Sequence, residues 1–237
     1  MKKYNVKKFI FSSSATVYGN PGISKMNEKM LRGKTTNPYG TTKVMIEKIL
    51  EDLYASDNSW DICILRYFNL VGAHESGLLG EVPNGIPNNL MPYIMQVASG
   101  KREYLNVYGD DYDTIDGTGV RDFIHVVDLA KGHLKALEKL DREEKGIFYY
   151  NLGTVKPHSV LEMVNSFEKI NNVKVKYKIA NRRKGDLAEV YADPSKANEE
   201  LGWRTEKTLE DMCKDSWNFE KKNKSDSGTG FLSEKEK

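Results

Sequence analysis

The chain has 237 residues, of which 39% are hydrophobic, and its 36 basic and 34 acidic residues leave a formal net charge of +2. A chain of this size buries a sizeable core as one large domain or two small ones, and its balanced charge excludes the basic patches typical of nucleic-acid-binding proteins. No apolar run approaches the ~18 residues that a membrane-spanning helix needs, and residues 1–6 are too polar for a secretory signal, so the cytosol is the expected compartment. Two distant cysteines, Cys63 and Cys213, and four scattered histidines predict reduced thiols and no metal site.

The first predicted element is a strand over residues 7–12, which runs out into the serines of residues 12–14. In a parallel α/β sheet, ligands lie just beyond the carboxyl ends of the strands, so these hydroxyls lie where a substrate oxygen would be. The alternative is that the three serines belong to an ordinary loop and only hydrogen-bond the backbone.

A helix is predicted from Pro38 to about residue 55, because Asn37 can cap it, proline suits its first position and apolar residues follow at helical spacing. Tyr39 and Lys43 are four residues apart and share one face, whose continuation is apolar. A lysine there would hold a positive charge close to the phenol, which favours the phenolate form that a general base requires. The alternative is ordinary helix surface.

Residues 60–68 form the next predicted strand, nearly continuous in apolar residues as a covered parallel strand should be, and Asn69 leaves it on the ligand side. The remaining elements follow from the same patterns. Strands are predicted over residues 123–127, 146–152 and 173–179, helices over 90–98, 128–140, 159–170, 193–201 and 209–219, and loops over 75–89 and 116–121. Asn89 is expected to cap the helix that starts at residue 90.

Several motifs, in this order, resemble the extended short-chain dehydrogenase/reductase family and, within it, the UDP-glucose 4-epimerases. They are FIFSSSATVYG at residues 9–19, NPYGTTK at 37–43, LRYFN at 65–69, GIPNNLMPY at 85–93, DGTGVRDFIH at 116–125, YNLG at 150–153, RRKGD at 182–186 and LGW at 201–203. The resemblance covers residues 7 to about 220. It implies an α/β fold, with the C-terminal part of a Rossmann-type doubly wound parallel sheet and a smaller α/β substrate-binding domain.

The resemblance also implies a division of the chain. Residues 1–70, with residues 120–140 returning to them, are expected to form the C-terminal remnant of an NAD-binding domain, residues 71–220 to bind the UDP-sugar, and residues 221–237 to be a disordered tail. No glycine-rich dinucleotide-binding turn opens the chain. We therefore expect it to correspond to an epimerase without its N-terminal nucleotide-binding portion, to be inactive alone and to aggregate through an unpaired strand at residues 9–11.

The implied reaction is inversion at C4 of UDP-hexoses with NAD+, as in galactose metabolism, by a homodimer formed partly through the Tyr39 helix. Tyr39 takes the proton of the C4 hydroxyl, Ser14 hydrogen-bonds the same oxygen, and Lys43 favours the phenolate and contacts the nicotinamide ribose. Cofactor contacts are implied for Ser14, Tyr39, Lys43 and Phe68. Substrate contacts are implied for Asn69, Asn89, Leu90, Asn106, Tyr108, Arg121, Arg183, Asp186 and Val190. A small residue at position 190 leaves room for an N-acetyl group, so UDP-N-acetylhexoses are expected substrates too.

Two alternatives remain open. One is a related nucleotide-sugar 4,6-dehydratase or decarboxylase, disfavoured because residues 15 and 16 are Ala and Thr, where a dehydratase needs an acid pair. The other is a non-catalytic UDP-sugar-binding fragment. The expected partner is a UDP-hexose, and neither a nucleic acid nor a membrane is expected as a partner.

Overall fold

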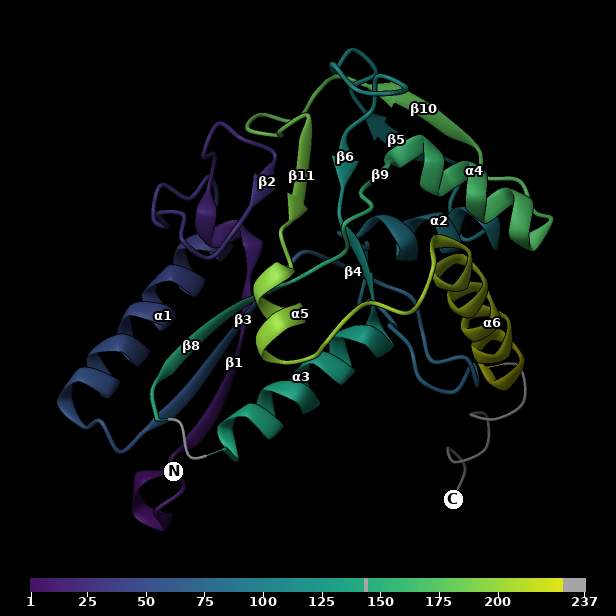
Figure 1. Cartoon of the computed structure of the whole chain (residues 1–237). Coiled ribbons are helices and arrows are strands. Elements are labelled where there is room, and N and C mark those ends of the chain that lie inside the picture. The colour runs from purple at the N-terminus through teal and green to yellow at the C-terminus, as the bar shows by residue number, and fades with distance from the viewer. Residues whose placement is uncertain (143–144, 228–237) are drawn as a thin grey trace, which may run out of the picture.

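A three-stranded parallel sheet, ordered β1 (Lys8–Ser14), β3 (Asp61–Tyr67) and β8 (Ile147–Leu152), forms one portion of the molecule (Figure 1). The computed structural model describes residues 1–142 and 145–227. β3 is buried along nearly its whole length, which explains its almost continuous apolar sequence. All three strands were expected, but β8 belongs to this sheet, whereas the sequence assigned it to the sugar-binding portion.

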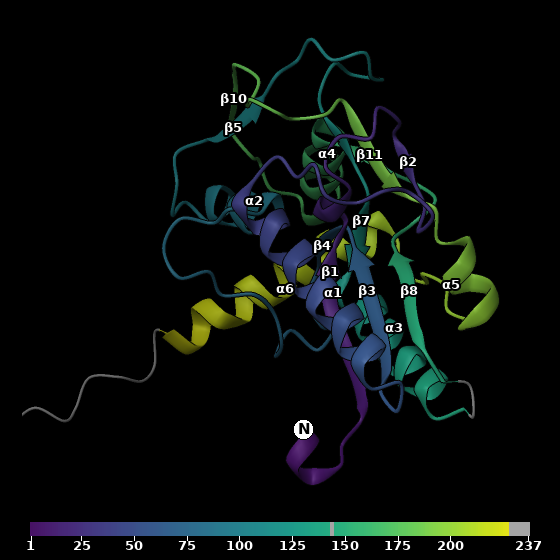
Figure 2. The same cartoon turned by 90° about the vertical axis from the view of Figure 1, so that its left-hand side faces the viewer.

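Two helices cover opposite faces of this sheet, α1 (Pro38–Ser56) and α3 (Val126–Leu140) (Figure 2). Side chains alternate along a strand, so Ile62 and Ile64 pack beneath α1 while Cys63 and Leu65 pack toward α3. Of residues 120–140, which the sequence assigns to this portion, those of α3 pack against β1 and β3. Residues 120–121 and 123–125 instead pair with strands outside this sheet.

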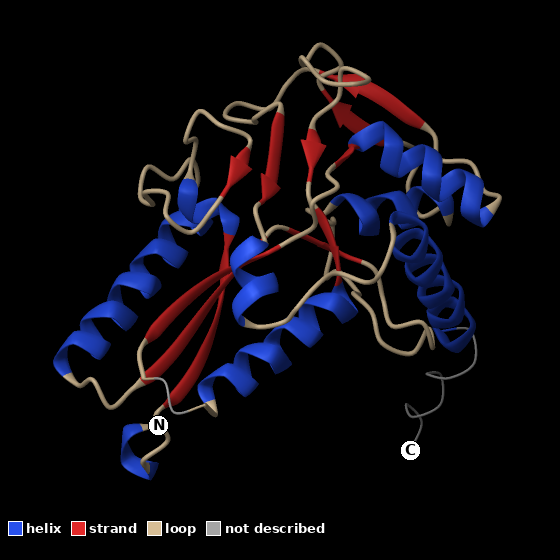
Figure 3. Ribbon diagram, in the orientation of Figure 1, coloured by secondary structure: helices blue, strands red, loops and turns tan. Residues whose placement is uncertain are grey.

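The second portion consists of short strands and helices on the carboxyl side of the parallel sheet (Figures 1 and 3). Its four-stranded sheet has the order β2 (Lys25–Met26), β11 (Glu189–Ala192), β6 (Val120–Arg121) and β9 (His158–Ser159). Two parallel pairs accompany it, β5 (Leu105–Tyr108) with β10 (Tyr177–Ala180), and β4 (Asn69–Val71) with β7 (Phe123–His125). Its helices are α2 (Leu90–Ala98), α4 (Val160–Asn171) and α6 (Leu209–Ser227). A further helix, α5 (Ser195–Glu200), packs against β8 of the parallel sheet, and the short 3-10 helices η1 (Lys2–Tyr4) and η2 (Ala15–Tyr18) precede and follow β1.

Helix starts follow from local hydrogen bonds. The Asn37 side chain accepts a bond from the Gly40 backbone N–H at 2.8 Å, as predicted. α3 begins two residues before its predicted start, because Nδ1 of His125 accepts from the Val127 N–H at 3.1 Å and caps it. Asn89 occupies the cap position of α2, but its side chain makes no capping bond and instead lies 3.4 Å from Glu81. The expected side-chain cap is therefore wrong.

Other boundaries differ where the sequence offers no periodic pattern. Residues 120–121, expected in a loop, form β6, and the strand expected over 173–179 begins only at Tyr177. α6 continues to Ser227, so the first part of the predicted tail is helical, and residues 228–237 lie outside the described residues. Within residues 1–142 and 145–227, no helix is long and apolar enough to cross a bilayer.

Candidate active site

Two adjoining cavities lie where the two portions meet. The first, of about 580 Å³, is bounded by β5, β6 and the start of α2, and the second, of about 480 Å³, lies at the carboxyl end of β1. Both cavities are lined by the same five residues at their junction: Asn69, Leu70, Asn89, Arg121 and Asp186. The two cavities therefore form one elongated site, as expected beyond the carboxyl ends of parallel strands.

The second cavity brings Ser14 and Tyr39 together from two elements. Ser14 ends β1, and its Oγ accepts a hydrogen bond from Oγ1 of Thr16 at 3.0 Å. Tyr39 lies in the first turn of α1 and is 52% exposed, so its phenol can reach a ligand. A hydroxyl and a phenol facing one cavity can hold the same substrate oxygen and move its proton.

Lys43 stands one helical turn behind Tyr39. Its Nζ lies 5.4 Å from the centre of the Tyr39 ring and donates to the backbone oxygen of Ser12 at 2.8 Å. Burial lowers the pKa of Lys43 from its ordinary value. The lysine thus joins α1 to β1 beside the phenol.

Close packing at Gly40 sets the approach of α1 to the site. A Cβ at Gly40 would lie 3.0 Å from the backbone oxygen of Thr16 and 3.3 Å from its Cβ. A glycine there lets the first turn of α1 approach η2, which begins directly after Ser14.

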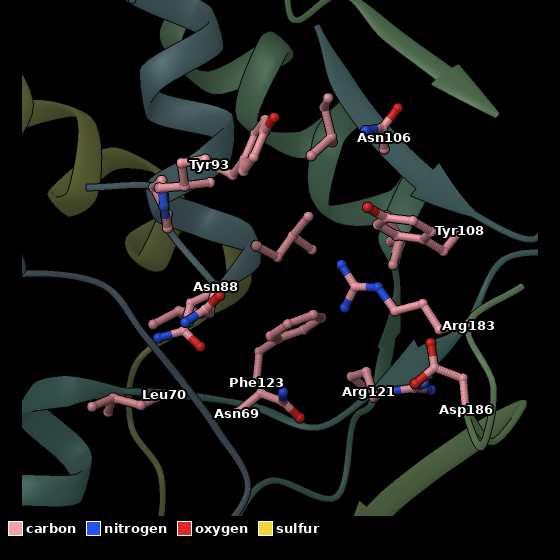
Figure 4. Close-up of a pocket in the computed structure, with 18 of the residues that line it drawn as sticks. Asn69, Leu70, Asn88, Tyr93, Asn106, Tyr108, Arg121, Phe123, Arg183 and Asp186 are labelled. Carbon is pink, nitrogen blue, oxygen red and sulfur yellow. The ribbon is translucent and has the colours of Figure 1, made fainter. Parts of the chain in front are cut away.

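Two arginines with different surroundings line the first cavity. The side chain of Arg121 is largely buried, and its Nη2 lies 3.9 Å from Oδ1 of Asp186; burial lowers the Arg121 pKa. The Arg183 guanidinium lies 3.8 Å from the centre of the Tyr108 ring and points toward the middle of the cavity (Figure 4). Cations with so little anionic compensation suit an anionic ligand such as a diphosphate.

Only Arg183 of the three cations at residues 182–184 lines the first cavity. Arg182 instead donates to Asp111 at 2.6 Å and stacks on Tyr112 at 4.0 Å. Of the two neighbouring arginines, Arg183 is thus the one placed to meet a ligand in the first cavity.

All the predicted site residues apart from Lys43 line at least one of the two cavities. The residues reaching the second cavity are Ser14, Tyr39, Phe68, Asn69, Asn89, Arg121, Asp186 and Val190. The residues reaching the first are Asn69, Asn89, Leu90, Asn106, Tyr108, Arg121, Arg183 and Asp186.

Sequence reasoning missed further lining residues of the first cavity, among them Leu70, Asn88, Tyr93 and Phe123 (Figure 4). Tyr112 lines the same cavity. A signal existed for two of them. Phe123 is two residues after Arg121, so strand alternation brings it to the same side, and Tyr93 lies four residues beyond Asn89, on the same face of α2.

Similarity to known proteins identifies the family of this chain. A family model described as "NAD dependent epimerase/dehydratase family" matches residues 1–153. The chain is 59% identical over 223 residues to the UDP-glucose 4-epimerase of Bacillus subtilis, covering 94% of this chain and 65% of that protein. It is 56% identical over 229 residues to the human UDP-glucose 4-epimerase, covering 97% of this chain and 66% of that protein. The chain thus spans slightly less than two thirds of the length of these relatives.

Solved structures share the fold. The UDP-glucose 4-epimerase of Bifidobacterium longum in complex with NAD+ and UDP matches with a TM-score of 0.89 and 56% identity, over 94% of this chain and 66% of that one. The Stenotrophomonas maltophila enzyme, with bound NAD and formylated UDP-arabinopyranose, matches with a TM-score of 0.91 and 47% identity, over 95% and 67%. The α/β fold is that of these Rossmann-type enzymes, and the chain belongs to the NAD dependent epimerase/dehydratase family.

Proposed function

We propose that this chain binds a UDP-hexose along the two joined cavities and supplies the proton-transfer residues for NAD-dependent inversion at C4. The observation that carries the proposal is the junction itself. The cavity with Arg121, Arg183 and Tyr108 continues into the one with Ser14 and Tyr39 through shared lining residues. A nucleotide at one end would therefore extend its sugar toward the hydroxyl and phenol at the other.

The first cavity suits the UDP part of the ligand. The Tyr108 ring offers a stacking surface for the pyrimidine, and Asn106 on the same strand carries amide groups for its edge. Arg121 and Arg183 suit the diphosphate, since guanidinium groups bind phosphate oxygens in pairs. Asp186 accepts hydrogen bonds, as a ribose hydroxyl would offer, and Asn89 and Leu90 stand at the start of α2 nearby.

At the other end, Tyr39 would take the proton of the C4 hydroxyl while Ser14 hydrogen-bonds the same oxygen and relays the proton. Lys43 would hold its charge beside the phenol and present its remaining N–H groups to a ribose hydroxyl. Phe68, which lines the same cavity, offers an apolar contact for a nicotinamide ring. NAD+, when bound, supplies the hydride acceptor that the protein side chains lack.

The sugar range follows from Val190. This half-buried side chain on β11 lines the same cavity as Ser14 and Tyr39. A small residue there leaves room for an N-acetyl substituent, so the proposed substrates include UDP-GlcNAc and UDP-GalNAc beside UDP-glucose and UDP-galactose.

Two experiments test the proposal. Calorimetry on the 237-residue chain should detect UDP binding. Because no glycine-rich dinucleotide turn occurs in this sequence, we expect that polypeptide by itself not to bind NAD+ or turn over substrate. UDP binding together with NAD+ binding and turnover would contradict that expectation and support the enzyme directly.

The catalytic part is tested in a chimera that joins the N-terminal third of the Bacillus subtilis relative to this chain. It should interconvert UDP-galactose and UDP-glucose, and Tyr39→Phe should lower the rate about 10²-fold or more. Tyr54→Phe, on the same helix but lining neither cavity, is the control. UDP binding without activity of the chimera would favour the non-catalytic binding alternative, and absence of UDP binding would overturn the proposal.

A further inference from the structure

A fully buried carboxylate lies behind the candidate active site. Glu47 is on α1, one helical turn beyond Lys43 and two turns beyond Tyr39, so the three side chains share one helix face. Its side chain is 0% exposed and lines neither cavity. Nothing in the proposed chemistry uses it, yet burying a charged group is costly unless it has a task and partners.

The partners of Glu47 come from three other segments. Oε1 accepts hydrogen bonds from Oγ of Ser13 at 2.6 Å and from Nε of Arg66 at 3.0 Å. Oε2 accepts from Nη2 of Arg66 at 2.6 Å and from Nη1 of Arg32 at 2.8 Å. One carboxylate on α1 thereby ties the helix to β1, to β3 and to the loop before α1.

The tie to β1 is made directly beside the catalytic hydroxyl. Lys43 holds the backbone oxygen of Ser12, Glu47 holds the side chain of Ser13, and Ser14 follows as the residue that faces the second cavity. Two helix residues that lie one turn apart, Lys43 and Glu47, therefore hydrogen-bond two adjacent residues of the strand. This arrangement fixes how far α1 sits along β1, and with it the separation of the Tyr39 phenol from the Ser14 hydroxyl.

The guanidinium groups of Arg32 and Arg66 compensate the negative charge of Glu47. Arg66 is 3% exposed, and its guanidinium lies 5.1 Å from the centre of the Tyr18 ring and 4.9 Å from the centre of the Tyr149 ring. Burial alone would raise the pKa of Glu47, but hydrogen bonds from Arg66, Ser13 and Arg32 and the charge of Arg66 lower it below its ordinary value. The carboxylate stays ionised, and its bonds are of the strong, charge-assisted kind.

We infer that Glu47 is a positioning residue that holds Tyr39 and Ser14 at the spacing needed to grip one hexose hydroxyl between them. The inference rests on the proposed function. Loss of the Glu47 bond to β1 lets α1 and β1 shift against each other. The UDP part of the ligand binds elsewhere and is unaffected, whereas the grip on the sugar weakens.

The test compares UDP with UDP-galactose by calorimetry on the full chain, without NAD+, so that no turnover is required. The ratio of the two affinities measures the contribution of the sugar. Ser13→Ala removes one bond while Glu47 keeps both arginines, so this variant is expected to stay folded. Glu47→Gln removes the charge.

Wild type should bind UDP-galactose about tenfold more tightly than UDP. In both variants this ratio of affinities should fall most of the way to one, while the affinity for UDP stays within about twofold of wild type. Glu51→Gln is the matched control. Glu51 is one turn further along α1 and also pairs with Arg32, but it contacts neither Ser13 nor Arg66.

An unchanged ratio in Ser13→Ala and Glu47→Gln would overturn the inference, as would a wild-type chain that gains nothing from the hexose or an equal loss in Glu51→Gln. A wild-type chain that binds neither ligand would instead overturn the proposed function, so the two failures are distinguishable.

Discussion

Arg121 and Asp186 face each other where the two cavities meet, with Nη2 of the arginine 3.9 Å from Oδ1 of the aspartate. At this separation the carboxylate only partly compensates a guanidinium whose pKa burial lowers. An anionic group at the junction would complete the compensation, and in the proposed complex that group is the diphosphate.

The first prediction concerns Arg121. Arg121→Gln should lower the affinity for UDP about 10- to 100-fold, since a hydrogen bond to a charged group contributes roughly 1.5–3 kcal/mol. Calorimetry at fixed ionic strength measures the change, and circular dichroism checks that the variant is folded. An affinity within twofold of wild type would show that the diphosphate does not lie at this junction.

A second prediction concerns the start of α1. Asn37→Ala removes the side-chain acceptor of the Gly40 N–H and should lower the free energy of unfolding by about 1 kcal/mol. Urea denaturation measures the change. The control is Asn20→Ala, which removes an acceptor of the Gly22 N–H in an exposed turn and should change stability by less than ~0.5 kcal/mol. Equal effects of the two changes would contradict the capping role.

The sequence predicts the start of α1 but not the short strands β2 and β6. The start of α1 was predictable because a cap, a proline and apolar periodicity all lie within one local segment. β6 and β2 were not, because two-residue strands carry no alternation and depend on the distant β11 for pairing.

The same limit applies to the site. The resemblance named Arg183 as a contact, but no local feature of the sequence distinguishes Arg183, which lines the cavity, from Arg182, which pairs with Asp111. The role of Glu47 could not be predicted either, since this residue lies on α1 and its partners Ser13 and Arg66 lie on β1 and β3. Motif resemblance named individual contact residues, whereas the bonds that align them required the tertiary structure.

A third prediction concerns pH. Asp122 is fully buried, and although hydrogen bonds from Ala192 and Thr154 act against it, burial raises its pKa to about 6 from an ordinary value of 3.8. The folded state then binds the proton more tightly than the unfolded state. The group's contribution to stability is therefore fully present below pH ~3.8 and is lost as the pH rises through ~6.

This contribution amounts to roughly 3 kcal/mol at most, at about 1.4 kcal/mol per pKa unit. Urea denaturation of wild type and Asp122→Asn at several values between pH 4 and pH 7 isolates it, because the other groups cancel in the difference. Wild type should lose stability relative to the variant as the pH rises. A difference that is constant with pH would contradict the raised pKa.

A fourth prediction concerns the sugar range. Val190→Tyr should fill the space beside Ser14 and Tyr39 and lower the affinity for UDP-GlcNAc relative to UDP-glucose about tenfold or more. Val82→Tyr, at an exposed position outside both cavities, serves as the control. Equal loss for both sugars would show that Val190 does not face the position that carries the N-acetyl group.

The most direct test of a UDP site in the first cavity is UDP calorimetry on wild type and on two neighbouring variants, Arg183→Gln and Arg182→Gln. Arg183 points into the cavity beside Tyr108, while Arg182 pairs with Asp111 outside it. Wild type should bind UDP, Arg183→Gln should bind it at least about tenfold more weakly, and Arg182→Gln should bind it within about threefold of wild type. No UDP binding by wild type, or an equal loss in the two variants, would contradict the account.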